Sequence, residues 1–198
     1  MPKTLLAMAG ADLSPSAISS SVLILIDCQN EYVTGALPLV GVDDAMMAAQ
    51  GILRRFRDLN APIIHIQHHG NPGGAFDLDQ DRGQIDDRVA PINGEDVIFK
   101  ALPNSFAGTA LKGRLKEIAR RDLIIVGFQT HMCVSATTRA ALDMGYKNTL
   151  IADAIATRDL PGAAGGPDIP AADIHNATLA ALADRFAIVV QSVSDIPD

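Results

Sequence analysis

The stretch SVLILID, at residues 21–27, is a continuous apolar run that ends on an acid. A strand with this pattern is covered on both faces, as in parallel sheets that lie between layers of helices. Similar short runs recur along the chain and alternate with segments of helical period. We therefore expect strands at 21–27, 61–67, 96–100, 122–128, 147–153 and 186–191, and helices at 42–60, 107–121, 133–145 and 171–185.

Strands that alternate with helices predict a parallel α/β fold with right-handed connections. The 198 residues contain no internal repeat and no domain-scale linker, so we expect one domain over 1–198, with 1–20 as an N-terminal extension. Segments 68–96 and 154–170 are rich in Gly, Asp and Pro and are expected to be loops. Long loops in compact domains are often functional, so these two are expected to shape the site.

Composition excludes several classes of partner. The net charge is −7 and no block of Lys or Arg is present, which argues against nucleic acid and anionic membranes. Two cysteines are too few for a disulfide scaffold, and the first residues lack the long apolar core of a signal peptide. We expect a cytoplasmic protein that acts on a small molecule.

Three reactive side chains come where predicted strands end. Asp27 closes the first strand, Lys100 closes the third, and Cys133 begins the helix after the fourth. Ligand sites of open α/β sheets lie beyond the carboxyl ends of the strands. These three residues are therefore predicted to meet at one edge of the sheet.

Each residue suits a step of nucleophilic catalysis. Helix N-termini lower the pKa of cysteine from about 8.5 to roughly 3.5–7.5, so we expect Cys133 to be an activated nucleophile. Asp27 would carry protons to and from the reacting groups, and Lys100 would keep Asp27 ionised. Backbone N–H groups of the turn GFQTHMC would hold an oxyanion.

Other interpretations stay open from the residues alone. A free cysteine is commonly a small buried hydrophobe, Asp27 could cap a strand end, and Lys100 could be a solvated surface residue. A non-catalytic binding or assembly protein and a redox-active thiol protein are two further hypotheses. Cys28 would be the partner thiol in the redox case, but strand alternation turns it away from Asp27 and towards the core.

Three segments resemble a known family. LILIDCQNEY, VIFKALPNSFAGTAL and VGFQTHMCVSATTRAALDMGY are similar to the aspartate, lysine and nucleophile segments of the isochorismatase-like cysteine hydrolases. The resemblance extends from about residue 21 to about residue 191, and three motifs in order are far more specific than one short pattern. The fixed positions of the nucleophile segment are all present: Gly127, Thr130, Cys133, Val134, Thr137, Arg139, Ala141, Gly145 and Tyr146.

The resemblance implies a Rossmann-like three-layer α/β/α sandwich with a six-stranded parallel sheet. It also implies a catalytic triad of Asp27, Lys100 and Cys133, and a cis peptide at Phe128–Gln129. The backbone N–H groups of Gln129 and Cys133 would form the oxyanion hole. The implied reaction is hydrolysis of a C–N bond of a small amide or carbamoyl compound through a thioester, or of another acyl bond, without a cofactor. Members are usually oligomeric, so we expect a homodimer or homotetramer.

The segment HIQHHGNPGG departs from one branch of that family. Nicotinamidases carry a metal site built from an aspartate and histidines at this place, whereas this segment has no acid. His65 and His68 also fall on different faces of a strand. We expect no metal, with His65 inside the strand and His68 and His69 as loop residues near the pocket mouth. True isochorismatases generally lack the nucleophilic cysteine, so Cys133 favours acyl chemistry.

Six further residues are candidates for substrate contact. For the aromatic ones, packing in the core or at a subunit edge is an equal alternative. His131 has the alternative of facing a neighbouring loop. The candidates are Gln29, Tyr32, Phe76, Phe106, Thr130 and His131.

Overall fold

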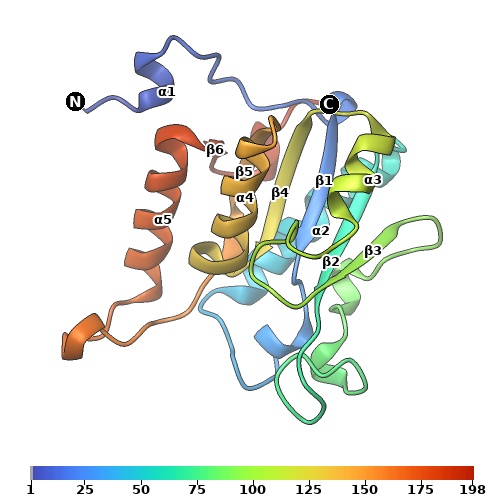
Figure 1. Cartoon of the computed structure of the whole chain (residues 1–198), viewed down its shortest axis with the longest axis vertical. Coiled ribbons are helices and arrows are strands. Elements are labelled where there is room, and N and C mark those ends of the chain that lie inside the picture. The colour runs from blue at the N-terminus through green and yellow to red at the C-terminus, as the bar shows by residue number, and fades with distance from the viewer. Residues whose placement is uncertain (1) are drawn as a thin grey trace.

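Six parallel strands form the centre of the protein (Figure 1). The computed structural model describes residues 2–198, and Met1 lies outside them. The strands are β1 (Ser21–Ile26), β2 (Ile63–His68), β3 (Asp96–Lys100), β4 (Asp122–Phe128), β5 (Lys147–Ala156) and β6 (Ile188–Val190). The helices are α1 (Leu5–Met8), α2 (Val42–Asp58), α3 (Leu111–Ile118), α4 (Ser135–Asp143) and α5 (Ala171–Arg185).

The strand order is β3-β2-β1-β4-β5-β6, and every pairing is parallel. The chain winds outward from β1 through β2 to β3, then crosses back and winds outward through β4, β5 and β6. The direction therefore reverses between β1 and β4, which is the place where open α/β sheets bind ligands. The expected sandwich with a six-stranded parallel sheet is confirmed.

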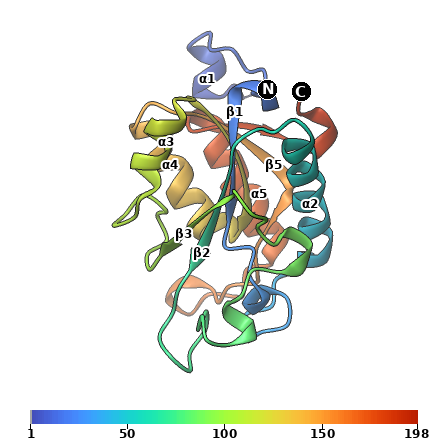
Figure 2. The same ribbon diagram turned by 90° about the vertical axis from the view of Figure 1, so that its right-hand side faces the viewer.

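Helices cover both faces of the sheet (Figure 2), with α2 on one side and α3 and α4 on the other. The buried residues of α2 recur every three or four positions and pack on one face of β1 and β4. Buried residues of α3, α4 and α5 pack on the other face. All six residues of β1 are buried, because both of its faces are covered.

Several predicted boundaries are wrong by a few residues. The helix expected at 107–121 is limited to Leu111–Ile118, since Gly108 and Ala119 on either side have positive φ of 69° and 59°. The last strand pairs only with β5 and is reduced to three residues. The helix expected to begin at Cys133 begins at Ser135, after a π-helical turn over Thr130–Val134.

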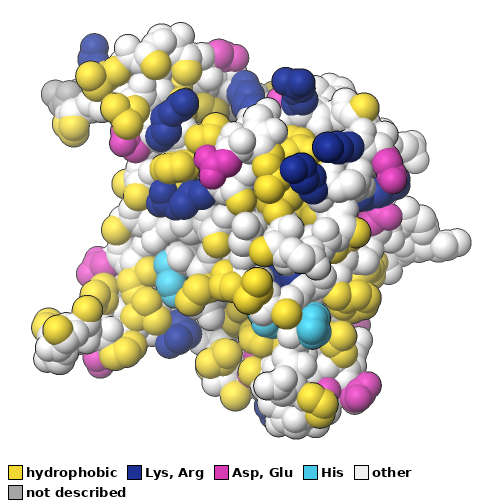
Figure 3. Space-filling model, in the orientation of Figure 1, with side chains coloured by type: hydrophobic (Ala, Val, Ile, Leu, Met, Phe, Trp, Pro, Cys, Tyr) yellow, Lys and Arg dark blue, Asp and Glu magenta, His cyan; other side chains and the backbone are white. Residues whose placement is uncertain are grey.

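The N-terminal extension carries one short helix. The N–H of Leu5, at the start of α1, donates to Asp184 Oδ1 of α5 at 2.8 Å, and α1 buries none of its residues. No helix within residues 2–198 combines the length and hydropathy that a membrane crossing requires. On the face shown in Figure 3, most Lys and Arg side chains lie over the upper half, while the visible histidines lie in the lower half.

Candidate active site

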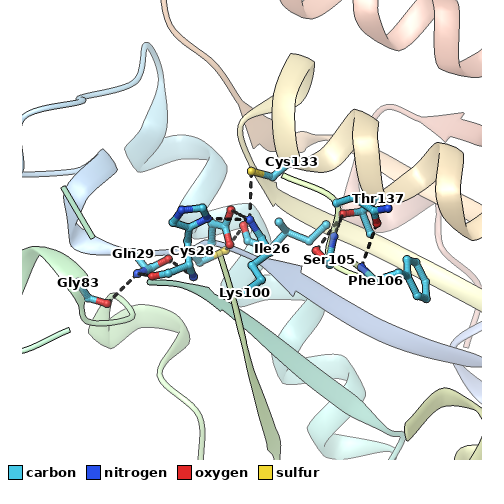
Figure 4. Close-up of polar contacts among 12 residues, drawn as sticks. Ile26, Cys28, Gln29, Gly83, Lys100, Ser105, Phe106, Cys133 and Thr137 are labelled. Atoms are coloured by element: carbon cyan, nitrogen blue, oxygen red, sulfur yellow. Dashed lines mark hydrogen bonds and ion pairs between the residues drawn. The ribbon is translucent and has the colours of Figure 1, made fainter. Parts of the chain in front are cut away.

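Asp27, Lys100 and Cys133 meet at the carboxyl ends of the strands. Lys100 Nζ lies 2.8 Å from Asp27 Oδ2 and 3.2 Å from Cys133 Sγ. The contact between the amine and the sulfur is drawn in Figure 4. The three residues are 0%, 1% and 4% exposed respectively, so water is nearly excluded from their contacts. The long side chain of Lys100 reaches from β3 across the end of β2 to the carboxylate that follows β1.

Backbone conformation brings β1 and β4 close together at this point. Gly127 has φ of 113°, and a Cβ there would collide with the carbonyl oxygen of Ile26 on the paired strand. Only glycine allows this approach. Asp27 itself has φ of 51°, and its N–H donates to Ile66 O at 2.9 Å. The chain thus leaves the strand at Asp27 while the carboxylate stays fixed at the sheet edge.

The turn after β4 places backbone N–H groups next to the sulfur of Cys133. The Phe128–Gln129 peptide bond is cis. The carbonyl of Gln129 accepts from the N–H groups of Met132 and Val134 at 3.0 and 3.3 Å. Within residues 2–198, the N–H of Gln129 has no backbone or side-chain acceptor, and the N–H of Cys133 belongs to the π-helical turn that carries the sulfur. An oxyanion above Cys133 would find donors of this kind.

The expected low pKa of Cys133 is wrong. Burial and the negative charge of Asp27 raise the pKa of the thiol, Lys100 opposes both, and the net value is about 12. The π-helical turn also separates the sulfur from the first residue of α4. Burial likewise raises the pKa of Asp27, against the effect of Lys100. The thiol of Cys133 therefore keeps its proton more firmly than a free cysteine, and the carboxylate of Asp27 is a stronger base than an exposed one.

His68 belongs to the same group of side chains, although the sequence placed it in a loop. It is the last residue of β2, and its Nδ1 lies 3.1 Å from Lys100 Nζ. Residues Ile64, Ile66 and His68 alternate onto the sheet face that Cys133 occupies. The predicted strand ended one residue too early, at Gln67. His68 was therefore assigned to the loop, and its contact with Lys100 was not predicted.

Asp27, His68 and Cys133 offer ligand atoms that all lie within 4.8 Å of one another. Zinc accepts this combination of donors. However, the Lys100 amine contacts each of the three side chains at 2.8–3.2 Å. The donors therefore already surround one cation, and a metal ion among them would lie against a buried ammonium group. The donor set does not fit a metal ion while Lys100 is in place.

Gln29 is placed differently from its expected position in the pocket lining. Its side chain is fully buried and donates to His68 O at 2.9 Å and Gly83 O at 2.7 Å, while its Oε1 accepts from His68 N at 2.8 Å. The amide nitrogen and oxygen of Gln29 are therefore both hydrogen-bonded to backbone groups. Gln29 holds the end of β2 in position.

The aromatic candidates divide into two groups. Tyr32 packs edge-on against Phe76 and Phe128, with centroids 5.1 and 5.8 Å apart, and the ring of Phe76 also meets His68 at 5.0 Å. Tyr32 and Phe76 therefore form an apolar wall next to the site. Phe106 stacks on Tyr146 at 6.2 Å and points away from Cys133 in Figure 4, so it packs in the core.

The polar candidates on the nucleophile turn contact neighbouring elements. Thr130 Oγ1 lies 2.9 Å from His175 Nδ1 of α5, and His131 Nδ1 lies 2.7 Å from Thr157 Oγ1 after β5. Both contacts fasten the turn to the second half of the sheet. These contacts leave Thr130 and His131 each with one polar side-chain atom already paired.

His65 of β2 and His69, just after β2, make no contact with the triad. His65 is buried on the opposite sheet face, where its Nε2 lies 2.9 Å from Glu95 Oε2. His69 is exposed, and its backbone N–H donates to Lys100 O at 2.9 Å. Cys28 packs in the core cluster on the α2 side of the sheet, whereas Cys133 packs on the other side. A disulfide between these two thiols would have to cross the sheet.

Arg158 is a candidate for substrate binding that the sequence did not reveal. It follows the end of β5, forms no ion pair within residues 2–198, and its Nε is buried without a partner. Burial lowers the pKa of His131, and the charge of Arg158 lowers it further, so these side chains are neighbours. A cation without a counterion beside the nucleophile turn fits an anionic group. The only sequence signal was an arginine two residues beyond a strand end.

Comparison with known proteins agrees with this arrangement. The profile described as the isochorismatase domain matches residues 21–194. The secreted isochorismatase effector Isc1 of Verticillium dahliae is 34% identical over 93% of this chain and 95% of its own length. The uncharacterized isochorismatase family protein YddQ of Bacillus subtilis is 36% identical over 86% of this chain and 95% of its own length.

A solved structure matches almost the whole molecule. The crystal structure of an isochorismatase from Pseudomonas putida KT2440 has 43% sequence identity and a TM-score of 0.93, over 98% of this chain and 99% of the other. The strand order, the matched range and this likeness lead to one conclusion. The chain belongs to the isochorismatase-like hydrolase superfamily.

Proposed function

We propose that the protein hydrolyses a C–N bond of a small amide that carries an acidic group, through a thioester on Cys133. The observation that carries the proposal is the buried Lys100 amine, which contacts both the Asp27 carboxylate and the Cys133 sulfur. A lysine sealed from water between an acid and a thiol contributes little to stability. It is well placed to stabilise charge that moves between them during a reaction.

The first half of the reaction would form the acyl-enzyme. The sulfur of Cys133 attacks the amide carbon while its proton passes to Asp27, because the resting thiol is neutral. The oxygen gains negative charge and is held by the N–H groups of Gln129 and Cys133. Asp27 then gives the proton to the leaving nitrogen, and the C–N bond breaks.

The second half would release the acid. A water molecule takes the place of the amine, loses a proton to Asp27 and attacks the thioester carbon. The C–S bond breaks, the sulfur regains the proton, and the site returns to its resting state. Lys100 stabilises the negative charge on Asp27 or on the sulfur throughout, since it remains in contact with both.

The acidic group of the substrate would bind Arg158. Its half-buried guanidinium has no counterion in the described chain and lies on the β5 side of the nucleophile turn. Two relatives are named for hydrolysis of amides of acids: the maleamate amidohydrolase of Pseudomonas putida and the ureidoacrylate amidohydrolase RutB of Stutzerimonas stutzeri, 25% and 26% identical to this chain. Their names support the substrate class.

A panel of paired amides tests the proposal. Each pair consists of a small amide with a carboxylate and its neutral counterpart, with release of ammonia or amine as the measurement. We expect turnover of the acidic member and a mass increase on Cys133 in rapidly quenched samples. Absence of turnover across the panel, together with an unmodified Cys133, would contradict the proposed function.

A further inference from the structure

The imidazole of His68 lies beside the contact between Asp27 and Lys100, and only one of its two nitrogens has a partner there. Strand β2 separates β1 from β3 in the sheet, and His68 is its last residue. Nδ1 lies 3.1 Å from Lys100 Nζ. No partner for Nε2 lies within residues 2–198, and Nε2 is not sealed from solvent either.

Lys100 determines where His68 carries its proton. An ammonium group has only donors, so Nδ1 must be the acceptor in this contact. Burial and the charge of Lys100 lower the pKa of His68 to about 4, so the ring is neutral near pH 7. A neutral imidazole that accepts at Nδ1 carries its hydrogen on Nε2. The free nitrogen is therefore a hydrogen-bond donor.

The ring is held in position before any ligand arrives. The buried amide of Gln29 bonds both the N–H and the carbonyl of His68, at 2.8 and 2.9 Å. Phe76 packs edge-on against the ring at 5.0 Å, and the N–H of Phe76 donates to the buried carboxylate of Glu31 at 3.4 Å. A donor that is positioned in advance and left without a partner is typical of a binding site.

The order of the strands indicates which part of a substrate would lie above His68. The oxyanion donors follow β4, the proton carrier Asp27 follows β1, and His68 ends β2. Neighbouring strands are about 4.8 Å apart. A substrate with its carbonyl oxygen at the β4 end and its leaving nitrogen near Asp27 would continue over the end of β2.

We propose that His68 is a substrate-binding residue whose Nε2–H donates to an acceptor atom in the leaving group. This inference rests on the proposed amide hydrolysis and extends it. The enzyme would then prefer N-substituted amides whose leaving amine carries a carbonyl, carboxylate or hydroxyl oxygen over primary amides that release ammonia. With Arg158 beyond β5, the substrate would have its acid on the acyl side and its acceptor on the amine side.

Two substitutions test the roles of the two ring nitrogens of His68 separately. His68→Asn keeps an acceptor near the Nδ1 position for Lys100 but loses the donor at Nε2, whereas His68→Gln reaches the Nε2 position. The measurement is the ratio of kcat/KM between an acceptor-bearing N-substituted amide and the matched primary amide. We expect His68→Asn to lower this ratio about 10- to 100-fold, mainly through KM, and His68→Gln to restore part of it. His69→Asn, at the exposed neighbour, is the control and should leave the ratio unchanged.

The outcomes distinguish this inference from the proposed function. An unchanged ratio in His68→Asn, or equal losses of kcat on both substrates, would overturn the binding role and leave His68 as a positioning residue for Lys100. Inactivity of the wild-type protein on both amides would overturn the proposed hydrolysis and this inference with it. Thermal unfolding of each variant shows whether a loss of activity comes from misfolding.

Discussion

Two clusters of polar side chains lie on opposite faces of the sheet, and each includes one histidine of β2, His68 or His65. The site cluster consists of Asp27, His68, Lys100 and Cys133. The Glu95 cluster consists of Arg57, His65 and Glu95, in which Arg57 Nε and Nη2 lie 2.7 and 2.9 Å from the two carboxylate oxygens. Glu95 also accepts from His65 and from the N–H of Ile92, so each of its oxygens has a strong donor.

The two clusters differ in how fully the carboxylate of each is hydrogen-bonded. In the Glu95 cluster, one carboxylate receives four hydrogen bonds, which outweigh burial and lower its pKa to about 2. In the site cluster, a single ammonium contacts three acceptors, and neither oxygen of Asp27 has a well-aligned hydrogen bond. A carboxylate with every oxygen hydrogen-bonded stabilises the fold, whereas one with unpaired oxygens can accept a proton during a reaction. The predictions below test this division.

The largest expected effect is on activity, from Cys133→Ala. Removal of the nucleophile should lower kcat/KM by at least about 10³-fold, since residues of a nucleophilic triad act as a unit. Amine release from an acidic amide is the measurement. Cys28→Ala is the control, because this thiol is buried on the other face of the sheet. Cys28→Ala should lose about 1 kcal/mol of stability and keep its activity near wild type. Equal losses of activity in both variants would contradict the assignment of Cys133 as the nucleophile.

The next effect is on selectivity, from Arg158→Met. Hydrogen bonds to charged groups contribute about 1.5–3 kcal/mol, so KM for an acidic amide should rise about 10- to 100-fold relative to its neutral counterpart. Arg158→Lys should give an intermediate value, since a charge remains without the planar pair of donors. A KM that rises equally for both substrates would show that Arg158 does not bind the acid.

The third effect is on stability, from Glu95→Gln. The variant should lose about 1–3 kcal/mol of unfolding free energy at pH 7 and keep its activity. The folded pKa of Glu95 lies below its ordinary value of 4.5, at about 2. Its contribution is therefore present above about pH 4.5 and is lost as the pH falls towards 2. Denaturant unfolding should show a smaller difference in unfolding free energy between wild type and Glu95→Gln at pH 3 than at pH 7. An equal difference at both pH values would argue against the ionised carboxylate as its source.

The smallest effect is on the rate of alkylation of Cys133. Since burial raises the pKa of the thiol to about 12, its reaction with iodoacetamide should continue to accelerate up to at least pH 10. The Cys28→Ala background makes the signal specific to one thiol. A plateau near pH 8.5 or below would mean that the resting site holds a thiolate.

The sequence predicted the architecture because its signals are local. Continuous apolar runs such as Val22–Ile26 report burial on both faces, and the alternation of strands and helices leaves few parallel topologies. The convergence of Asp27, Lys100 and Cys133 also followed from strand ends alone. His68 was missed because the end of β2 was placed one residue early, and boundaries depend on pairing with β3, which no local pattern reports.

The sequence by itself determined the fold, the edge of the sheet that carries the site and the three residues that meet there. Only the tertiary structure decided their state. It surrounded Cys133 so completely that its pKa rises instead of falling. It used the amide of Gln29 to hold His68, and it left Arg158 without a counterion among residues 2–198. Desolvation and hydrogen-bond satisfaction depend on everything packed around a group, and residue order along the chain does not contain that information.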